Sequence, residues 1–130
     1  MDDIDFLSSG DVLFAHWDQI QRYGGDPGVR DLGLLESALS QPIASFEGQW
    51  LHQFPFEMAA AYLYHLVQNH PFVDGNKRTG AVAALLFLEL NGMEFNAPAG
   101  ALYDITMAVA NGQADKQAVA EFLRDHADSA

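Results

Sequence analysis

Ten consecutive residues, 70–79, hold most of the side chains that could do chemistry together, and they read His-Pro-Phe-Val-Asp-Gly-Asn-Lys-Arg-Thr. The segment combines an imidazole, a carboxylate, a Gly-Asn turn, two adjacent cations and a hydroxyl. An apolar segment ends before it at Asn69 and another begins after it at Gly80. We therefore expect two core helices to hold this polar segment in place, as a reactive site requires.

The second half of this segment has the chemistry of a phosphate-binding site. Gly75 allows the backbone to approach a ligand closely, and the free N–H groups of a helix start, together with its dipole, attract anions. Lys77 adds a point charge and Arg78 a planar fork suited to phosphate. We predict that this loop and the helix start behind it, down to Thr79, bind phosphates.

A plainer interpretation of the same residues is an Asp-Gly turn in which Asp74 or Asn76 caps the helix and the two bases are solvated. The residues alone leave this alternative open, although it does not explain the His-Pro-Phe in front. The loop is not the P-loop of the common NTPases, because the preceding glycine, its four-residue spacer and a preceding strand are missing.

Three residues in the first half of the segment have candidate roles. His70 could take a proton from an attacking hydroxyl as a general base, and the carboxylate of Asp74 could hold Mg²⁺ that bridges to the phosphates. Phe72 is expected to pack into the core and fix the loop. A lone histidine at a helix end is more often a partner of the helix dipole. We expect such ordinary roles for the other four histidines: His16, His52, His65 and His126.

Length and composition indicate one domain, 1–130, with a core that needs neither disulfides nor metal. The chain has no cysteine and a net charge of −12, from 18 acidic and six basic residues. Such a charge disfavours binding to nucleic acids and to anionic membranes. The N-terminus is acidic and no apolar run is long enough to cross a bilayer, so we expect a cytoplasmic protein.

The patterning predicts an all-α fold of about six helices arranged around the apolar helix 79–90. The other helices are expected at 9–23 with Ser9 or Asp11 as cap, 31–41, 55–69, 98–110 and from 115 onward. Residues 41–54 are irregular and suggest a flap or small hairpin, bent at Glu47-Gly48, beside the reactive loop. We also expect an acidic lead-in at 1–8, an extended piece at 93–95 and a frayed tail from Asp125.

The segment 70–79 resembles the signature of the Fic/Doc superfamily, and the lysine after the asparagine resembles its death-on-curing (Doc) branch. The segment 22–28, Arg-Tyr-Gly-Gly-Asp-Pro-Gly, and the overall length are also similar. This resemblance implies a Fic-type helical bundle in which His70 deprotonates a target hydroxyl, Phe72 anchors the loop and Asp74 binds Mg²⁺ or orients the hydroxyl. Gly75 and Asn76 would cradle phosphates, and Lys77 and Arg78 would neutralise them.

The resemblance further implies a toxin that uses ATP and Mg²⁺ to phosphorylate a threonine of elongation factor Tu, and that is inhibited by a separate antitoxin protein. Adenylylating Fic enzymes carry Gly where this chain has Lys77, and a second Arg where it has Ala81. These two departures favour kinase chemistry over AMP transfer. The alternatives are a protein adenylyltransferase on the same fold and an inactive binding protein that keeps the loop as a relic.

Overall fold

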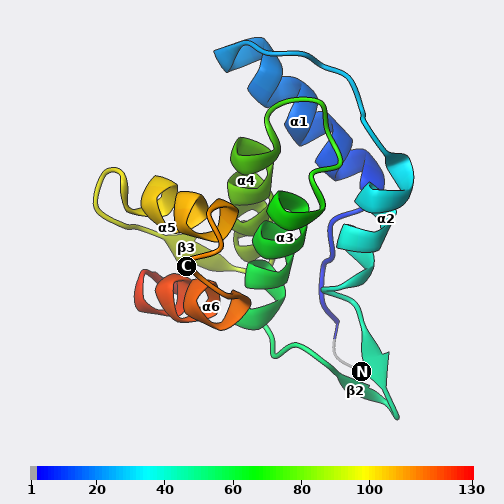
Figure 1. The fold of residues 1–130 in the computed structure, drawn as a ribbon. Coiled ribbons are helices and arrows are strands. Elements are labelled where there is room, and N and C mark those ends of the chain that lie inside the picture. Colours follow the sequence, from blue (N-terminus) through cyan, green and yellow to red (C-terminus); the bar gives the residue numbers. More distant parts are fainter. Residues whose placement is uncertain (1–2) are drawn as a thin grey trace.

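A computed structural model describes residues 3–130, which form six helices and two small two-stranded sheets (Figure 1). In chain order the elements are α1 (Ser9–Tyr23), α2 (Leu32–Ser40), β1 (Ser45–Phe46), β2 (Gln49–Trp50), α3 (Phe56–Asn69), α4 (Asn76–Leu90), β3 (Met93–Phe95), α5 (Ala101–Ala110), α6 (Lys116–Asp125) and β4 (Ala127–Ser129). The predicted all-α bundle is confirmed. Within the described residues no helix is long and apolar enough to cross a bilayer.

Two helices, α3 and α4, pack against each other at the centre of the bundle. We expected only the second to be central, but α3 contacts α2, α4, α5 and α6 and has eight buried residues. The two helices come close at Gly80, where an added Cβ would lie 3.0 Å from Val67 Cγ2 and 3.1 Å from the carbonyl oxygen of Leu63. The connection between these two central helices is the segment with the candidate chemistry.

The helix starts follow local capping, with differences from the sequence-based boundaries. Asp31 and Asp115 cap α2 and α6 as expected, but the cap of α1 is Ser8, which forms a reciprocal capping box with Asp11. Helix α4 begins at Asn76, three residues before the expected start, and α5 begins three residues after Pro98. The early start of α4 places both motif cations in its first turn.

The hairpin predicted within 41–54 is confirmed, with strands β1 and β2 joined through Glu47-Gly48. Its predicted position beside the reactive loop is wrong. The ring of Trp50 lies 5.4 Å from that of Phe6, which lies 5.8 Å from Phe87 near the end of α4. The reactive loop precedes the start of this helix, about 16 Å away along its axis. Figure 1 shows the hairpin and the loop at opposite ends of α3.

Both ends of the described chain are attached to the bundle. Residues 127–129 pair with β3 as strand β4, so the prediction of a frayed tail is wrong for this part. The start of the expected acidic lead-in, residues 1–2, lies outside the described residues. Its later part is fixed by bonds from the Asp5 N–H to Asn91 Oδ1 and from the Leu7 N–H to the Tyr62 hydroxyl. The expected extended piece at 93–95 is confirmed as β3.

Candidate active site

The loop between α3 and α4 is closed by the side chain of Asn76. Its Oδ1 accepts a hydrogen bond from the Phe72 N–H (2.9 Å), and its Nδ2 donates to the Phe72 carbonyl (2.9 Å). The same Nδ2 lies 3.1 Å from Nδ1 of His70. Because the two bonds to Phe72 set the orientation of the amide, Nδ2 is a donor and Nδ1 of His70 must accept. The neutral ring of His70 then carries its proton on Nε2.

His70 ends α3 in the left-handed conformation, with φ 53° and ψ 53°, and its side chain is exposed. The two residues that follow, Pro71 and Phe72, are buried, and Phe72 is completely inaccessible. The loop therefore has the apolar anchor that we expected of Phe72, and an exposed imidazole.

A second segment, residues 24–31, holds the loop from outside. The N–H groups of Arg30 and Asp31 donate to the Pro71 carbonyl (2.8 and 3.0 Å), and the N–H of Val73 donates to the Gly28 carbonyl (3.0 Å). The guanidinium of Arg30 also donates to the carbonyls at the end of α3, those of residues 69 and 70, at 3.0 and 2.7 Å. We did not predict a role for Arg30, which neutralises a helix end that lies beside the site.

A buried histidine of α1, to which we assigned no function, contacts both halves of the loop. The ring of His16 is stacked on that of Phe72, with centroids 3.8 Å apart and an angle of 5° between the planes. Its Nε2 lies 2.8 Å from the carbonyl oxygen of Asp74. One sequence signal could have identified it, namely its place on the apolar face that α1 forms with Val12 and Ile20.

The first turn of α4 presents free backbone donors. No side chain caps this helix, and its first internal bond runs from the Thr79 N–H to the Gly75 carbonyl (2.9 Å). The N–H groups of Asn76, Lys77 and Arg78 have no acceptor within residues 3–130. No acidic residue lies in this turn. This is the arrangement in which a helix start binds an anion.

The two motif cations have different surroundings. Lys77 is exposed and makes no hydrogen bond or ion pair with another described residue. The guanidinium of Arg78 donates to the Gly24 carbonyl (3.1 Å) and, at 3.5 Å, to the Gln19 carbonyl, and it lies 5.7 Å from the ring centroid of Tyr23. Part of the donor capacity of Arg78 is thus used to hold the end of α1. The Lys77 ammonium has no such partner among the described residues and is the more available of the two for a ligand.

Asp74 lies against the glycine turn that follows α1. Its Oδ1 accepts from the Gly75 N–H (2.9 Å), and its Oδ2 is 3.4 Å from the backbone nitrogen of Asp26. A Cβ on Gly25 would approach Oδ2 to 2.6 Å, so a larger residue at that position would displace the carboxylate. Among the described residues no group of three acidic or imidazole ligands could hold a metal ion. A single exposed carboxylate beside a helix start that could bind phosphates nevertheless fits Mg²⁺, which takes most of its ligands from phosphates and water.

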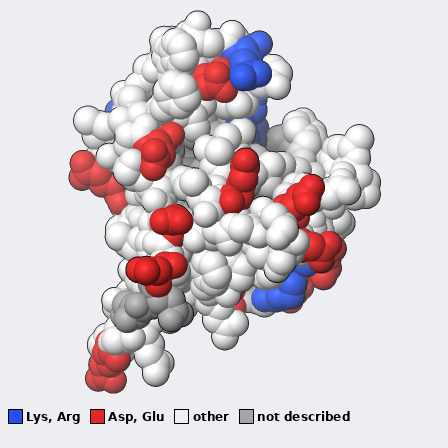
Figure 2. All heavy atoms as spheres, turned by 180° about the vertical axis from the view of Figure 1, so that it is seen from behind, with Lys and Arg blue, Asp and Glu red and all other residues white. Residues whose placement is uncertain are grey.

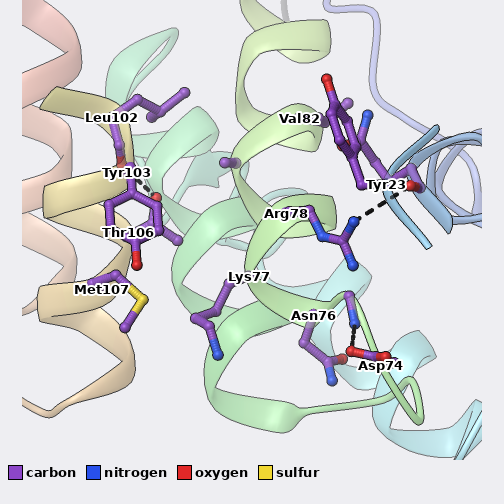
Figure 3. Close-up of a pocket in the computed structure, with 13 residues that line it drawn as sticks. Tyr23, Asp74, Asn76, Lys77, Arg78, Val82, Leu102, Tyr103, Thr106 and Met107 are labelled. Carbon is purple, nitrogen blue, oxygen red and sulfur yellow. Dashed lines mark hydrogen bonds between the residues drawn. The ribbon is translucent and has the colours of Figure 1, made fainter. Parts of the chain in front are cut away.

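A cavity of about 520 Å³ opens beside the start of α4 (Figure 3). Its polar end is formed by residues 74–78, and its apolar wall by α5 and the next turn of α4. The residues of that apolar wall are Ala81, Val82, Leu102, Tyr103, Thr106 and Met107. In Figure 3 Lys77 extends into the space between α4 and α5, whereas Arg78 points toward α1 and Tyr23. The size and the two-part lining suit a nucleotide.

Three predicted site residues lie outside the wall of this cavity. Phe72 is completely buried, and His70 is exposed. Thr79 is fully buried, its N–H is used inside α4, and its hydroxyl has no partner among the described residues. The prediction that Thr79 contacts phosphate is therefore wrong, because the early start of α4 turns this side chain into the core.

The two adjacent cations at the start of α4 contrast with the acidic composition of the chain. Figure 2 shows acidic side chains scattered over the face opposite to that of Figure 1, with basic ones at few places. The chain has only six lysines and arginines. Two of them lie at one helix start, a concentration of positive charge that favours an anion there.

The sequence is similar to those of known proteins. Residues 6–88 match the model of the Fic/DOC family. The chain is 36% identical over 119 residues to the protein kinase doc of Escherichia phage P1. The aligned region covers 91% of this chain and 92% of that protein. It is 39% identical over 97 residues to the toxin Doc of Mycolicibacterium smegmatis. That aligned region covers 75% of this chain and 68% of that protein.

Proposed function

The chain belongs to the Fic/Doc family, and we propose that it is a Doc-type toxin that phosphorylates a protein hydroxyl with ATP. The observation that carries this proposal is the uncapped start of α4, with Lys77 free in its first turn and a nucleotide-sized cavity next to it. The relatives named as a kinase and as a toxin support the same activity. The proposed target is a threonine of elongation factor Tu, as the resemblance implies.

In the proposed reaction the phosphates of ATP lie at the start of α4, on the N–H groups of residues 76–78. Lys77 and the free face of Arg78 neutralise their charge. The target hydroxyl attacks the γ-phosphorus, a new O–P bond forms, the bond from γ-phosphorus to the bridging oxygen breaks, and ADP leaves. Asp74 would hold Mg²⁺, which would supply further charge neutralisation at the phosphates.

His70 receives the hydroxyl proton in this scheme. The hydrogen bond from Asn76 leaves Nε2 protonated in the resting ring, so Nε2 can accept a proton only in the other tautomer. In that tautomer Nδ1 bears hydrogen and no longer accepts from Asn76. Long-range ¹H–¹⁵N NMR spectra should therefore show the Nε2–H tautomer in the free protein, and an Asn76→Ala variant should shift the ring toward the Nδ1–H form. An Nδ1–H ring in the free wild-type protein would contradict this assignment.

The position of the label distinguishes the proposal from its alternatives. Incubation with elongation factor Tu and γ-labelled ATP should label the target and increase its mass by about 80 Da, whereas AMP transfer from α-labelled ATP would add about 329 Da. Label from the α-phosphate would replace the kinase proposal by adenylylation. The His70→Ala variant is the control and should abolish labelling. If it left toxicity in cells unchanged, the catalytic proposal would give way to an inactive binding protein.

We also propose that the protein acts in the cytoplasm, where such a target is found, and that a separate antitoxin restrains it. The relative named toxin Doc supports the antitoxin. Coexpression with the protein encoded next to it should restore growth of cells that express this chain. Absence of any rescue by neighbouring reading frames would count against a toxin–antitoxin pair.

A further inference from the structure

His16 is a buried polar residue of α1 that has no role in the reaction proposed above. Only 2% of its surface is exposed. Its Nε2 lies 2.8 Å from the carbonyl oxygen of Asp74, and its ring is stacked on Phe72. A carbonyl oxygen only accepts hydrogen bonds, so Nε2 carries the proton and donates it to this oxygen.

The carbonyl that His16 binds belongs to the Asp74–Gly75 peptide, which leads into α4. Gly75 has φ 79° and ψ 17°, in the left-handed region. A trans peptide points its C=O and its N–H in opposite directions. With the Asp74 carbonyl directed at α1, the Gly75 N–H points away from α1 and binds Asp74 Oδ1.

The direction of this peptide matters for an anion at the start of α4. In the observed state the negative carbonyl oxygen is directed to the buried side, and an N–H group faces the carboxylate that lines the cavity. In the opposite state the carbonyl oxygen would replace that N–H and would repel both Asp74 and a bound phosphate. Space also favours glycine at position 75. A Cβ there would lie 3.2 Å from Ile20 Cδ1, which is a tight contact, and 3.6 Å from His16 Cδ2.

We propose that His16 is a positioning residue that holds the Asp74–Gly75 peptide in the direction required for phosphate binding. The inference rests on the proposed function, because it assumes that the start of α4 receives the phosphates of a nucleotide. The ring of His16 also supports Phe72, whose backbone binds Asn76, and Asn76 in turn binds His70. One imidazole of α1 thus supports the phosphate site through the peptide and the proposed base through Phe72.

Two substitutions separate the hydrogen bond from the stacking. His16→Phe keeps an aromatic ring on Phe72 but removes the N–H donor, whereas His16→Gln keeps a side-chain N–H and removes the ring. The matched control is Val12→Ala, which opens a cavity in the same helix one turn away from His16, at a residue that is fully buried and outside the loop. It should lower stability without changing the direction of the peptide.

Two measurements are made on each purified full-length variant: ATP-Mg²⁺ affinity by calorimetry, and the ¹⁵N shift and hydrogen exchange of the Gly75 amide. We expect His16→Phe to weaken ATP binding about tenfold, the effect of one lost buried hydrogen bond, with a large shift of the Gly75 resonance. His16→Gln should bind within about threefold of wild type and keep the resonance near its original position. Val12→Ala should change neither.

Two results would overturn the inference. One is a His16→Phe protein with wild-type affinity and an unmoved Gly75 amide. The other is equal loss of affinity in all three variants, because that would reduce His16 to an ordinary core residue. If the wild-type protein bound no ATP and labelled no target, the proposed function would fail. The ¹⁵N shift and the hydrogen exchange of the Gly75 amide in the variants would still show whether His16 sets the direction of the Asp74–Gly75 peptide.

Discussion

Replacement of Gly25 by alanine should cause a large loss in the rate of phosphate transfer and a moderate loss of stability. A Cβ at this position would lie 2.6 Å from Asp74 Oδ2, 3.0 Å from Ile20 Cδ1 and 3.1 Å from Asp74 Cγ. Ordinary contact begins near 3.4 Å, so the carboxylate has to retreat by about 0.8 Å. A misplacement of about 1 Å in a catalytic group can lower the rate about 100-fold. We expect a loss of that order in transfer to the target.

Backbone strain adds a separate effect on stability. Gly25 has φ +122°, and an L-residue held at such an angle costs about 1–3 kcal/mol. For a chain of this length that corresponds to a decrease in Tm of roughly 4–12 °C. The neighbouring Gly24 is the matched control, since it has φ +84° and a Cβ there would meet nothing within 4 Å. Gly24→Ala should lower Tm to a similar extent but keep activity within about threefold.

The assay compares initial rates of phosphate transfer and melting curves for both variants. Equal losses of activity in Gly24→Ala and Gly25→Ala would refute the reasoning, because strain would then explain the whole effect. A double-mutant cycle adds a second check. In an Asp74→Ala background, Gly25→Ala should cause little further loss of activity, since the group that it displaces is gone.

Three further predictions concern the packing of the helices around the loop and the stability of the fold. Gly80→Ala should lower the free energy of unfolding by about 1–3 kcal/mol, because its Cβ would press on the Leu63 carbonyl oxygen at 3.1 Å; an unchanged Tm would contradict this close approach. Arg30→Ala should accelerate hydrogen exchange in residues 70–75, because two bonds to carbonyls at the end of α3 are lost; unchanged exchange would refute its role. Burial, and then the charge of Lys116, lowers the pKa of His65 to about 4 from 6.5. As the pH falls, the unfolded chain takes up the proton first. The free energy of unfolding should therefore be highest above about pH 6.5 and decrease toward pH 4. Chemical denaturation at several pH values should show a smaller decrease for His65→Gln.

The polar loop and its flanking helices were predictable because their signals are local. The Asp-Gly-Asn sequence between two apolar segments indicates a turn and a helix start, and Phe72 in front of it indicates an anchor. The boundary error at α4 has a similar origin. We began the helix at the first residue of its apolar pattern, Thr79, whereas the left-handed Gly75 starts it earlier and buries the threonine.

The contacts that stabilise the loop could not be derived from local patterns, because their partners are distant in sequence. His16 lies 58 residues from the carbonyl that it binds, and Arg30 lies 40 residues from His70. Arg78 was expected to face phosphate alone, but tertiary packing also brings it against the Gly24 carbonyl, 54 residues away. The hairpin at 41–54 was identified from its turn, yet its distance from the loop depends on the packing of Trp50.

The freedom of Lys77 has a consequence for how the reaction can change during evolution. The loop is shaped by buried groups such as His16, Phe72 and Asn76, whereas the Lys77 side chain supports none of these contacts. Under the proposed function, a substitution at position 77 would alter the charge presented to a nucleotide and leave the buried contacts of the loop intact. The resemblance implies that adenylylating Fic enzymes carry glycine at this position. A change of nucleotide binding at position 77 would therefore not require the loop to unfold.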